Sequence, residues 1–265
     1  MKIVCCVKQV LDPEIPPGAF HVAEDGRSPE VRGIPESRVI DSYGENALET
    51  AIQLRDGVGE GEVTALAVGG EEMDDALRRA LAFTADRGVR VWDPSWGELD
   101  GITVGLLLAA AVDALGGADL ILCGREASDV EEGVVGPAIA EALDLPCVTI
   151  ARRVEIEEGR VRVERESDGL IEVVAAEPPA VITVTSSDAN VPRMPKVRDV
   201  MLSKGKPIRV LGPADLGTGP SPSPRARLLR LVKPEAGGEC ERIEGEDGRA
   251  LAAALLDRLG REQVL

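Results

Sequence analysis

Aromatic side chains are scarce in this chain of 265 residues, which has only 2 Trp, 1 Tyr and 2 Phe. Proteins that bind single-stranded nucleic acid stack the bases on aromatic rings, so this composition argues against that class. Cations are also in the minority, because 30 Lys and Arg stand against 47 Asp and Glu and give a formal net charge of −17. Nucleic acids and anionic membranes bind proteins of the opposite sign, so neither is an expected partner.

Histidine is nearly absent too, since the chain has a single one, His21, in a segment rich in proline. Nucleophilic catalysis of the Ser-His-Asp or Cys-His kind therefore has no plausible base. The phosphate-binding pattern G-x-G-x-x-G does not follow the first strand, and G-x-x-x-x-G-K-[ST] occurs nowhere. Paired carboxylates such as Glu131 and Glu132 are common on surfaces and give little support to acid–base catalysis. These residues predict a carrier or binding protein rather than a self-sufficient enzyme.

The cysteines are odd in number and are never spaced C-x-x-C, which argues against a disulfide framework and against a zinc site. We expect them to be small buried hydrophobic residues in a reducing cytoplasm. They are Cys5, Cys6, Cys123, Cys147 and Cys240. Residues 1–7 are too short for a signal peptide, and the longest apolar run, 102–112, is too short to cross a membrane. The sequence therefore predicts a soluble, cytoplasmic protein.

Short apolar runs alternate with helical stripes over the first 150 residues. Strands are predicted at 2–7, 62–68, 89–92 and 119–123, and helices at 43–55, after Gly70, at 102–115 and at 133–143. Ser42 and Glu45 have the spacing of a capping box at the start of the first helix. The proline-rich residues 8–41 are predicted to form an irregular excursion from the first strand. This alternation predicts an α/β fold built on a parallel sheet.

The second half of the chain has a different pattern. Two β-branched runs at 161–165 and 170–175, joined by Glu-Ser-Asp-Gly, predict a hairpin, and a third run lies at 180–185. A basic helix is predicted at 196–204, and the Gly, Pro and Ser residues of 212–224 predict an extended arm. A last helix, 249–259, carries Leu251, Leu255 and Leu259 on one face.

We expect that face to hold a partner, with packing against the chain's own sheet as the alternative. The predicted organisation is therefore an α/β domain with its hairpin, residues 1–211, followed by the arm and helix, residues 212–265.

Parallel sheets bind ligands beyond the carboxyl ends of their strands, where the strand order reverses. The loops that would lie there are 6–13, 41–44, 68–70 and 124–135. The last of these begins with Gly124 and Arg125 and leads into a helix, and the free N–H groups of a helix N-terminus suit a phosphate. Arg125 would offset the acidic background at this place.

Residues 160–206 combine the patterns V-x-R-E-x-D-G-x-x-E, P-A-V-x-T and N-x-P-R with a following methionine and spaced lysines. The combination resembles the signature of the β subunit of electron-transfer flavoprotein, and weaker similarity extends over the whole chain. Leu170 departs from the family by replacing its second glycine, Met194 replaces its usual aromatic residue, and the lysine run is reduced to Lys204 and Lys206. The matching residues are Val163, Arg165, Glu166, Asp168, Gly169, Glu172, Pro179, Ala180, Val181, Thr183, Asn190, Pro192, Arg193, Met201, Lys204 and Lys206.

The resemblance implies an open parallel α/β sheet of the adenine-nucleotide α-hydrolase-like (HUP) type, with a β-hairpin extension and a C-terminal arm that embraces a partner. It also implies AMP, or a second FAD in electron-bifurcating members, in the carboxyl-edge loops. A further FAD would be shared with the α subunit, and Tyr43 matches an aromatic residue near that flavin. The cofactor-binding residues implied in this way are Cys6, Asp41, Ser42, Tyr43, Gly44, Val68, Gly124, Arg125, Glu126, Ala127, Ser128, Asp129, Val130, Glu131, Glu132, Gly133, Val134 and Val135.

The partners that the resemblance implies are an α subunit, in a heterodimer, and the proteins that exchange electrons with it. Donors would be dehydrogenases of the acyl-CoA dehydrogenase type or NADH, and an acceptor would be a quinone oxidoreductase. Val197 falls at the apolar anchor of the family's docking loop, with a plain helix-packing role as the alternative. Where many members carry small polar residues, this chain has Glu131 and Glu132, whose charges would repel a phosphate, so we hypothesise weak or altered nucleotide occupancy.

Two other functions fit the predicted fold. One is a stand-alone adenine-nucleotide-binding sensor, which would be colourless and would associate with itself. The other is an ATP-dependent adenylating ligase, which the sequence disfavours because Val7-Lys8-Gln9-Val10 stands where S-G-G-x-D-S would bind pyrophosphate.

Overall fold

The computed structural model describes residues 1–217, 223–234 and 240–264. The chain divides into two compact units, Met1–Arg230 and Leu231–Leu265, and each is described by itself. The larger unit is built on a sheet of nine strands in the order β11-β10-β9-β12-β8-β1-β6-β7-β13. The smaller unit contains one helix, α6 (Gly248–Arg261), within its described part.

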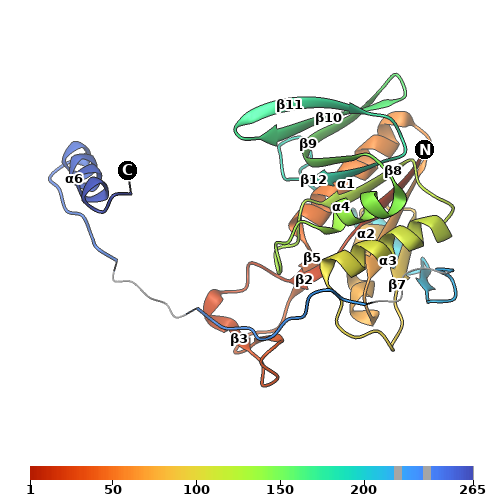
Figure 1. The fold of residues 1–265 in the computed structure, drawn as a ribbon, viewed down its shortest axis with the longest axis horizontal. Coiled ribbons are helices and arrows are strands. Elements are labelled where there is room, and N and C mark those ends of the chain that lie inside the picture. Colours follow the sequence, from red (N-terminus) through yellow and green to blue (C-terminus); the bar gives the residue numbers. More distant parts are fainter. Residues whose placement is uncertain (218–222, 235–239, 265) are drawn as a thin grey trace. The chain divides into compact units, whose positions relative to one another are not determined.

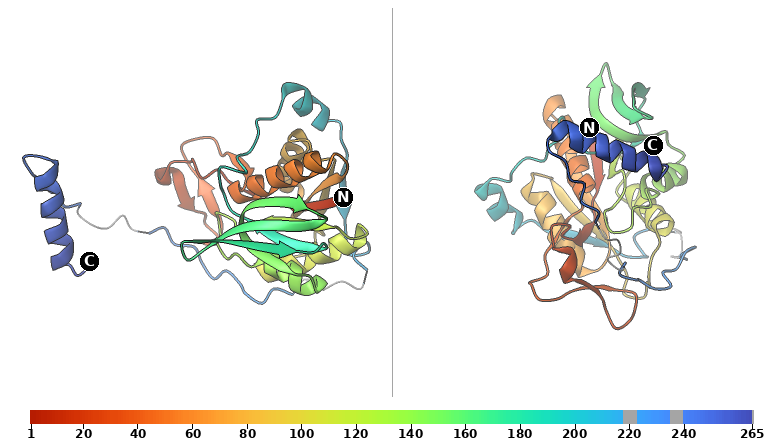
Figure 2. Two further views of the ribbon diagram at one scale, coloured as in Figure 1. Left: turned by 90° about the horizontal axis from the view of Figure 1, so that it is seen from above. Right: turned by 90° about the vertical axis from the view of Figure 1, so that its left-hand side faces the viewer.

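The central strands run parallel, and those at one margin run antiparallel. The parallel strands are β1 (Lys2–Cys6), β6 (Glu62–Val68), β7 (Arg87–Val91), β8 (Leu120–Gly124), β9 (Cys147–Glu157), β12 (Ala180–Val184) and β13 (Ile208–Leu211). Strands β10 (Arg160–Ser167) and β11 (Leu170–Ala176) form the predicted antiparallel hairpin, and β10 also pairs antiparallel with β9. The sheet is thus mixed and mostly parallel, and the hairpin continues it at one margin (Figures 1 and 2).

Two strands of this sheet were not predicted from the sequence. In β9 the polar residues Arg152 and Arg153 interrupt the apolar run, and Ile150 has a φ of 61°, which breaks the alternation of a regular strand. The pairing of β9 with β12 shifts in register at the same place. Strand β13 has only 4 residues and follows Pro207. It is defined by its parallel pairing with β7, which is a contact distant in sequence.

Four helices cover the two faces of the sheet. Helices α1 (Ser42–Val58) and α2 (Asp74–Ala82) contribute to one apolar core, and α3 (Gly101–Ala114) and α4 (Val135–Leu143) contribute to the other. Figure 1 shows α3 and α4 in front of the sheet and α1 behind it. Helices α3 and α4 approach closely, because a Cβ on Gly105 would lie 2.6 Å from the Cβ of Ala138. The large, fully buried side chains are Phe83, Ile3, Ile40, Leu48, Ile52, Leu66, Leu77, Leu81, Leu107, Leu120, Ile121 and Leu122.

The start of α1 corrects the predicted capping box. Asp41, not Ser42, is the N-cap residue, and its carboxylate accepts hydrogen bonds from the N–H groups of Tyr43 and Gly44. Aspartate is as good a cap as serine, so the spacing to the later glutamate does not decide which residue caps the helix. Glu45 instead forms an ion pair with Arg79 of α2, 2.5 Å apart.

The excursion of residues 8–41 is more ordered than predicted. Strand β2 (Gln9–Leu11) pairs antiparallel with β5 (Arg38–Ile40), and β3 (Phe20–Val22) pairs with β4 (Pro29–Val31). The described part of the chain also has two short 3₁₀ helices, Pro17–Ala19 here and Glu71–Met73 before α2. Because β5 returns beside β2, the excursion ends next to the carboxyl end of β1, where α1 begins.

Helix α5 (Val197–Ser203) lies where the basic helix is predicted, and it is fastened to α2. The guanidinium of Arg78 donates to the carbonyls of Ser203, 2.9 Å away, and Lys206. The ammonium of Lys206 in turn donates to the carbonyl of Ala85, 2.8 Å away. Lys206 is therefore a structural contact within this chain.

The predicted extended arm is wrong over its first residues. Residues 212–217 turn back on themselves, since the N–H of Asp215 donates to the carbonyl of Gly212 and Leu216 packs against the core beside α3. Residues 218–222 of the predicted arm lie outside the described residues. Helix α6 is present, with Asp247 as its N-cap, and its Leu251 and Leu255 are exposed. Within the described residues, no helix combines the length and the apolar character needed to cross a bilayer.

Candidate functional site

The strand order reverses between β1 and β8. From β1 the chain proceeds through β6 and β7 on one side, and β8 then pairs with β1 on its other side. Ligands of open parallel sheets bind beyond the carboxyl ends of the strands at such a switch point. The residues that follow β1 and β8, together with the start of α1, meet here, and they include most of the predicted site.

Asp41 joins two of the predicted loops. One oxygen of its buried carboxylate, Oδ2, accepts from the N–H groups of Tyr43 and Gly44, at 3.1 and 3.3 Å. The other, Oδ1, accepts from the N–H of Ser128 at 2.8 Å. The same side chain thus begins α1 and holds the loop that follows β8. A carboxylate that accepts from several backbone N–H groups is a strong structural anchor.

Lys8 makes a second link across the switch point. Its ammonium lies 2.7 Å from Oδ1 of Asp129, and both side chains are partly exposed. The predicted cofactor-binding residues included Asp129 but not Lys8, although Lys8 lies in the predicted loop 6–13, just after the first strand. Position after the strand was the signal that could have identified it. The next residue, Gln9, is buried and accepts from the N–H of Ala76 at 3.1 Å, so this loop is also fixed to α2.

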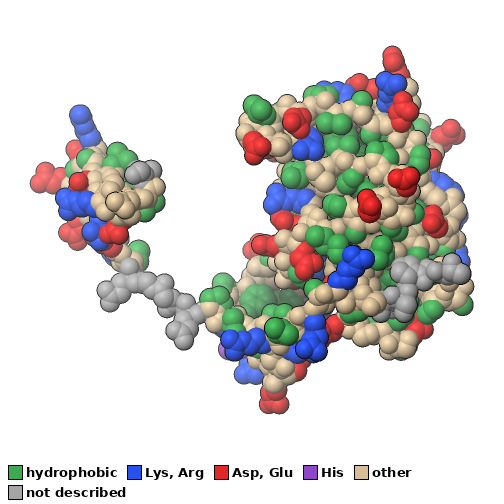
Figure 3. All heavy atoms as spheres, viewed as in Figure 1, with side chains coloured by type: hydrophobic (Ala, Val, Ile, Leu, Met, Phe, Trp, Pro, Cys, Tyr) green, Lys and Arg blue, Asp and Glu red, His purple; other side chains and the backbone are tan. Residues whose placement is uncertain are grey.

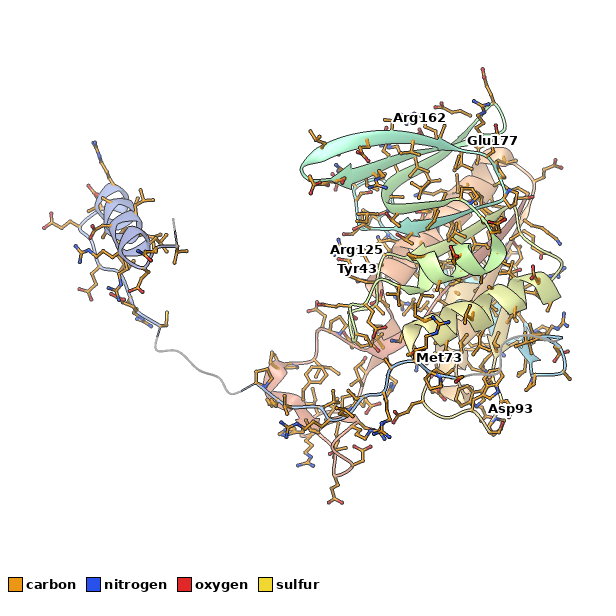
Figure 4. The ribbon with its side chains drawn as sticks, viewed as in Figure 1. Tyr43, Met73, Asp93, Arg125, Arg162 and Glu177 are labelled. Carbon is orange, nitrogen blue, oxygen red and sulfur yellow. The ribbon has the colours of Figure 1, made fainter. Side chains whose placement is uncertain are left out.

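Arg125 and Tyr43 lie against each other, as Figure 4 shows. The guanidinium carbon of Arg125 is 4.9 Å from the centre of the Tyr43 ring, a distance typical of a cation–π contact. The same guanidinium binds Oε1 of Glu126 through Nε at 2.8 Å and Nη2 at 2.5 Å. The hydrogen bonds to Glu126 raise the pKa of Arg125, and the nearby Tyr43, Glu126 and Glu131 raise it further. Arg125 therefore keeps its positive charge.

Gly124 allows β8 to approach α1. A Cβ at this position would lie 2.9 Å from the backbone nitrogen of Gly44 and 2.9 Å from both the carbonyl carbon and the Cβ of Tyr43. Contacts of this kind do not occur between real side chains and backbone, so only glycine fits here. The chain then continues to Arg125, whose N–H donates to the carbonyl of Val184 at 2.9 Å.

The loop between β8 and α4 ends in a helix without a side-chain cap. Val134 is the N-cap residue and no side chain accepts from the first N–H groups of α4. Glu131 and Gly133 have φ values of 55° and 65°, so this exposed loop turns sharply before the helix. Uncapped N–H groups and the helix dipole favour an anion, and the loop residues therefore fit a phosphate group.

The two glutamates of this loop take different directions. A Cβ on Gly101 would lie 2.6 Å from Oε2 of Glu132, so this carboxylate rests against the first residue of α3. Carboxylates are stabilised at a helix N-terminus, which explains this position. Glu131 is close enough to Arg125 to contribute to raising the pKa of that residue. The charge of Glu131 therefore acts on the cation that would receive a phosphate.

Val68 and Cys6 occupy less exposed places at this edge. Val68 ends β6, on the far side of β1 from β8, and the N–H of Gly70 beyond it donates to Oε1 of Glu72 at 2.9 Å. Cys6 is buried opposite Cys123, and this thiol contact together with burial raises the pKa of Cys123. All five cysteines are free thiols, but Cys147 and Cys240 are exposed, which corrects the expectation of buried hydrophobic residues for those two.

The N-x-P-R motif binds α1. The side-chain amide of Asn46 donates to the carbonyl and to Oδ1 of Asn190, at 3.0 and 3.2 Å. The guanidinium of Arg193 donates two hydrogen bonds, of 2.8 and 2.9 Å, to the carboxylate of the buried Glu49. The backbone N–H of Arg193 donates a third to the same carboxylate, at 3.2 Å. Burial by itself raises the pKa of Glu49, but the hydrogen bonds from Arg193 outweigh it and lower that pKa. The motif therefore fixes the segment that follows it.

That segment exposes apolar side chains. Around α5 these residues are Val191, Met194, Val197, Met201 and Leu202, and the exposed fraction of Val197 is 82%. Large exposed apolar side chains that gather on one segment are a common feature of protein docking surfaces. The position of this segment is fixed by the hydrogen bonds between Arg193 and Glu49 at one end and by the contacts of α5 with α2 at the other.

Known proteins resemble this chain in sequence over most of its length. The model of the electron transfer flavoprotein domain matches residues 34–216. "Electron transfer flavoprotein subunit beta" of Mycobacterium bovis is 36% identical over 229 residues, which covers 82% of this chain and 85% of the relative. The chain belongs to the electron transfer flavoprotein β-subunit family. A further member, from Megasphaera elsdenii, is 31% identical over 280 aligned residues and covers 100% of both chains.

A relative in this family with a different printed role is the "Caffeyl-CoA reductase-Etf complex subunit CarD" of Acetobacterium woodii, 28% identical over 272 residues that cover 100% of both chains. Membership of the electron transfer flavoprotein β-subunit family confirms the predicted resemblance. It also implies the involvement of a flavin in the function of this chain. Asn46 and Glu49 were not predicted as positioning residues, because a helical stripe shows which positions are buried but not which distant polar groups they meet.

Proposed function

We propose that this chain is the β subunit of a heterodimer with an α subunit, and that it carries electrons from a dehydrogenase or NADH to an acceptor. Donors of the acyl-CoA dehydrogenase type and an acceptor of the quinone oxidoreductase type agree with the family. The observation that carries the proposal is the switch point, where Asp41 joins the start of α1 to the loop after β8. This is the place where a nucleotide binds in a doubly wound sheet, here of the HUP type.

The nucleotide proposed for this site is AMP, or a second FAD if the protein is electron-bifurcating. The uncapped N-terminus of α4 and Arg125 would hold its phosphate, with the loops that contain Cys6, Tyr43 and Val68 around it. A second FAD would supply the capacity to accept and release electrons, whereas AMP would fill the site without redox chemistry. The residues of this chain bind and orient the nucleotide. Figure 3 shows Lys and Arg interspersed with Asp and Glu on the surface, so a local cation is needed to hold an anion.

The test of this site is the release of bound ligand. Purified protein is denatured, and the supernatant is separated by chromatography and quantified against AMP and FAD standards. The proposal predicts an adenine nucleotide, at less than one per chain if Glu131 and Glu132 weaken binding. A stoichiometric amount would contradict the weak occupancy while supporting the site. Failure to release or to bind any adenine nucleotide would overturn the site.

Residues 212–265 are proposed as the part that holds the α subunit, with residues 1–211 as the nucleotide-binding domain. The exposed stripe of Leu251 and Leu255 on α6 supports this, because an amphipathic helix buries its apolar face in a partner's groove. The exposed apolar residues around Val197 are proposed as the docking surface for the dehydrogenase.

Co-expression separates the carrier from the alternative, a stand-alone adenine-nucleotide sensor. A carrier should purify with a second chain as a yellow complex, and flavins counted per heterodimer distinguish the bifurcating form. A colourless, self-associated protein that binds AMP without a second chain would support the sensor instead.

A further inference from the structure

Tyr43 and Arg125 link two sites that have been proposed separately. Tyr43 lies in the first turn of α1 and is partly exposed, whereas Arg125 begins the loop that leads to the proposed phosphate position. They come from segments about 80 residues apart, yet the ring and the guanidinium stack at 4.9 Å (Figure 4). The positive charge of Arg125 can therefore do two things: it can attract a phosphate bound to the loop, and it already lies over the face of the Tyr43 ring.

The backbone fixes both partners of this contact. A Cβ on Gly124 would meet Tyr43 at 2.9 Å, so the two chain segments are in direct contact. Asp41 binds the N–H of Tyr43 on one side and that of Ser128 on the other. The N–H of Arg125 is bonded to Val184 in β12. Neither residue can move far without breaking these contacts, so the guanidinium has a defined position over the ring.

The guanidinium has three separate surfaces, and each has a different use. Glu126 occupies the edge formed by Nε and Nη2, and the Tyr43 ring covers one face. The Nη1 edge can donate to a further acceptor, as the planar fork of arginine does with phosphate. A phosphate bound there would reduce the positive charge that the ring experiences, without moving the ring.

We propose that Arg125 is a positioning residue that holds the Tyr43 ring and transmits to it the presence of a phosphate in the 124–135 loop. The proposal rests on the nucleotide site of the proposed function. It gives the nucleotide a role beyond filling space, because the aromatic side chain at the start of α1 responds to it. The charge of Arg125 connects the bound phosphate with the Tyr43 ring.

The test uses the single tyrosine of the chain. The full chain is labelled with 3-fluorotyrosine, which gives one ¹⁹F resonance from Tyr43, and every sample is measured in the same buffer. The variants are Arg125→Gln, which removes the charge, and Arg125→Lys, which keeps the charge without the planar stack. Arg87→Gln is the matched control, because Arg87 also pairs with a carboxylate, that of Glu62 at 2.8 Å, but lies at the start of β7, at the opposite edge of the sheet. Circular dichroism verifies that each variant is folded.

Without ligand, we expect Arg125→Gln to shift the Tyr43 resonance and Arg87→Gln to leave it in place. An unchanged resonance in Arg125→Gln would overturn the positioning role. Saturating AMP, verified by calorimetry, should displace the wild-type resonance, and this displacement should be lost for the most part in Arg125→Gln. A full displacement in that variant would overturn the transmission by Arg125.

Inorganic phosphate at saturation should displace the wild-type resonance in the same direction as AMP. Displacement by AMP but not by bound phosphate would assign the effect to the adenosine part and overturn transmission by the phosphate. Failure of the wild type to bind either probe would overturn the nucleotide site and the transmission together. The ligand-free comparison of Arg125→Gln with Arg87→Gln would still decide the positioning role on its own.

Discussion

At the scale of single residues, the site depends on side chains that serve two segments. Asp41 caps α1 and also binds the N–H of Ser128, and Lys8 reaches from the first strand to Asp129. A buried carboxylate that loses hydrogen-bond partners costs about 1–3 kcal/mol. Function and stability are therefore coupled at Asp41, because the same oxygens organise the site and hold α1.

The charges of Glu131 and Glu132 give a prediction at this scale. Replacing either by Gln should tighten the binding of AMP, by about two- to threefold each, since each change removes an exposed negative charge near the phosphate. The larger effect is expected for Glu131, which lies near Arg125. Titration calorimetry at low salt measures the affinities. Glu60→Gln, after α1 and before β6, is the control at the opposite edge of the sheet. Equal affinities in all three variants would contradict repulsion by these two residues.

At the scale of elements, close approach decides how strands and helices fit. Gly124→Ala would place a Cβ against the backbone of Tyr43 and Gly44, where neither neighbour is a flexible side chain. We expect a loss of about 1–3 kcal/mol in the free energy of unfolding, typical of overpacking, and weaker nucleotide binding. Urea unfolding measures the first. Gly57→Ala, in α1 with no atom within 4 Å of the added Cβ, should be neutral or slightly stabilising. A similar loss in both variants would argue against a specific contact at Gly124.

A second prediction for an element concerns the cap of α3 and the segment that crosses it. Asp100 accepts from the N–H of Thr103, at 2.8 Å, and from those of Arg225 and Ala226, at 2.5 and 2.8 Å. Burial alone raises the pKa of Asp100, but these hydrogen bonds outweigh it and lower the pKa from 3.8 to about 2. A carboxylate whose pKa is lowered on folding stabilises the protein above its unfolded pKa, and that stabilisation is lost as the pH falls.

The stability difference between wild type and Asp100→Asn should therefore be full above about pH 4 and should shrink as the pH falls toward about 2. Urea unfolding at a series of pH values measures it. Asp93→Asn, whose carboxylate is bonded only to Ser95 in an exposed turn, is the control and should show a smaller difference. A difference for Asp100→Asn that does not change with pH would contradict an ionised cap.

The elements also show how far the sequence predicts the fold. Helices and strands with a clear period were found from the sequence, and β6 was predicted with its observed bounds, Glu62–Val68. Strand β9 was missed because two arginines and a residue with positive φ interrupt it, and β13 because only its pairing with β7 defines it. The predicted loops meet at the switch point, yet the sequence could not show that Asp41 binds Ser128 or that Arg193 binds Glu49. These contacts join positions 87 and 144 residues apart, and periodicity carries no information at that range.

At the scale of the whole molecule, the proposed docking residues around Val197 belong to a segment other than the proposed nucleotide loops. The hydrogen bonds between Arg193 and Glu49 and the contacts between α2 and α5 hold these exposed apolar residues in place. Val197→Ala should raise the KM for an acyl-CoA dehydrogenase partner roughly three- to tenfold, because it truncates an exposed apolar anchor, and should leave flavin content unchanged. Electron transfer in the reconstituted heterodimer measures KM, and the visible spectrum measures flavin. Val58→Ala, exposed at the end of α1, is the control. Loss of flavin in Val197→Ala would indicate a structural role instead.

The shared carboxylate of Asp41 has a consequence for the motions of the site. Because it binds Tyr43 and Gly44 at one oxygen and Ser128 at the other, fraying of the first turn of α1 releases the loop after β8, and the reverse holds as well. Segments that share their contacts in this way open together as one cooperative unit in amide hydrogen exchange. A ligand that orders either segment therefore slows the exchange of both.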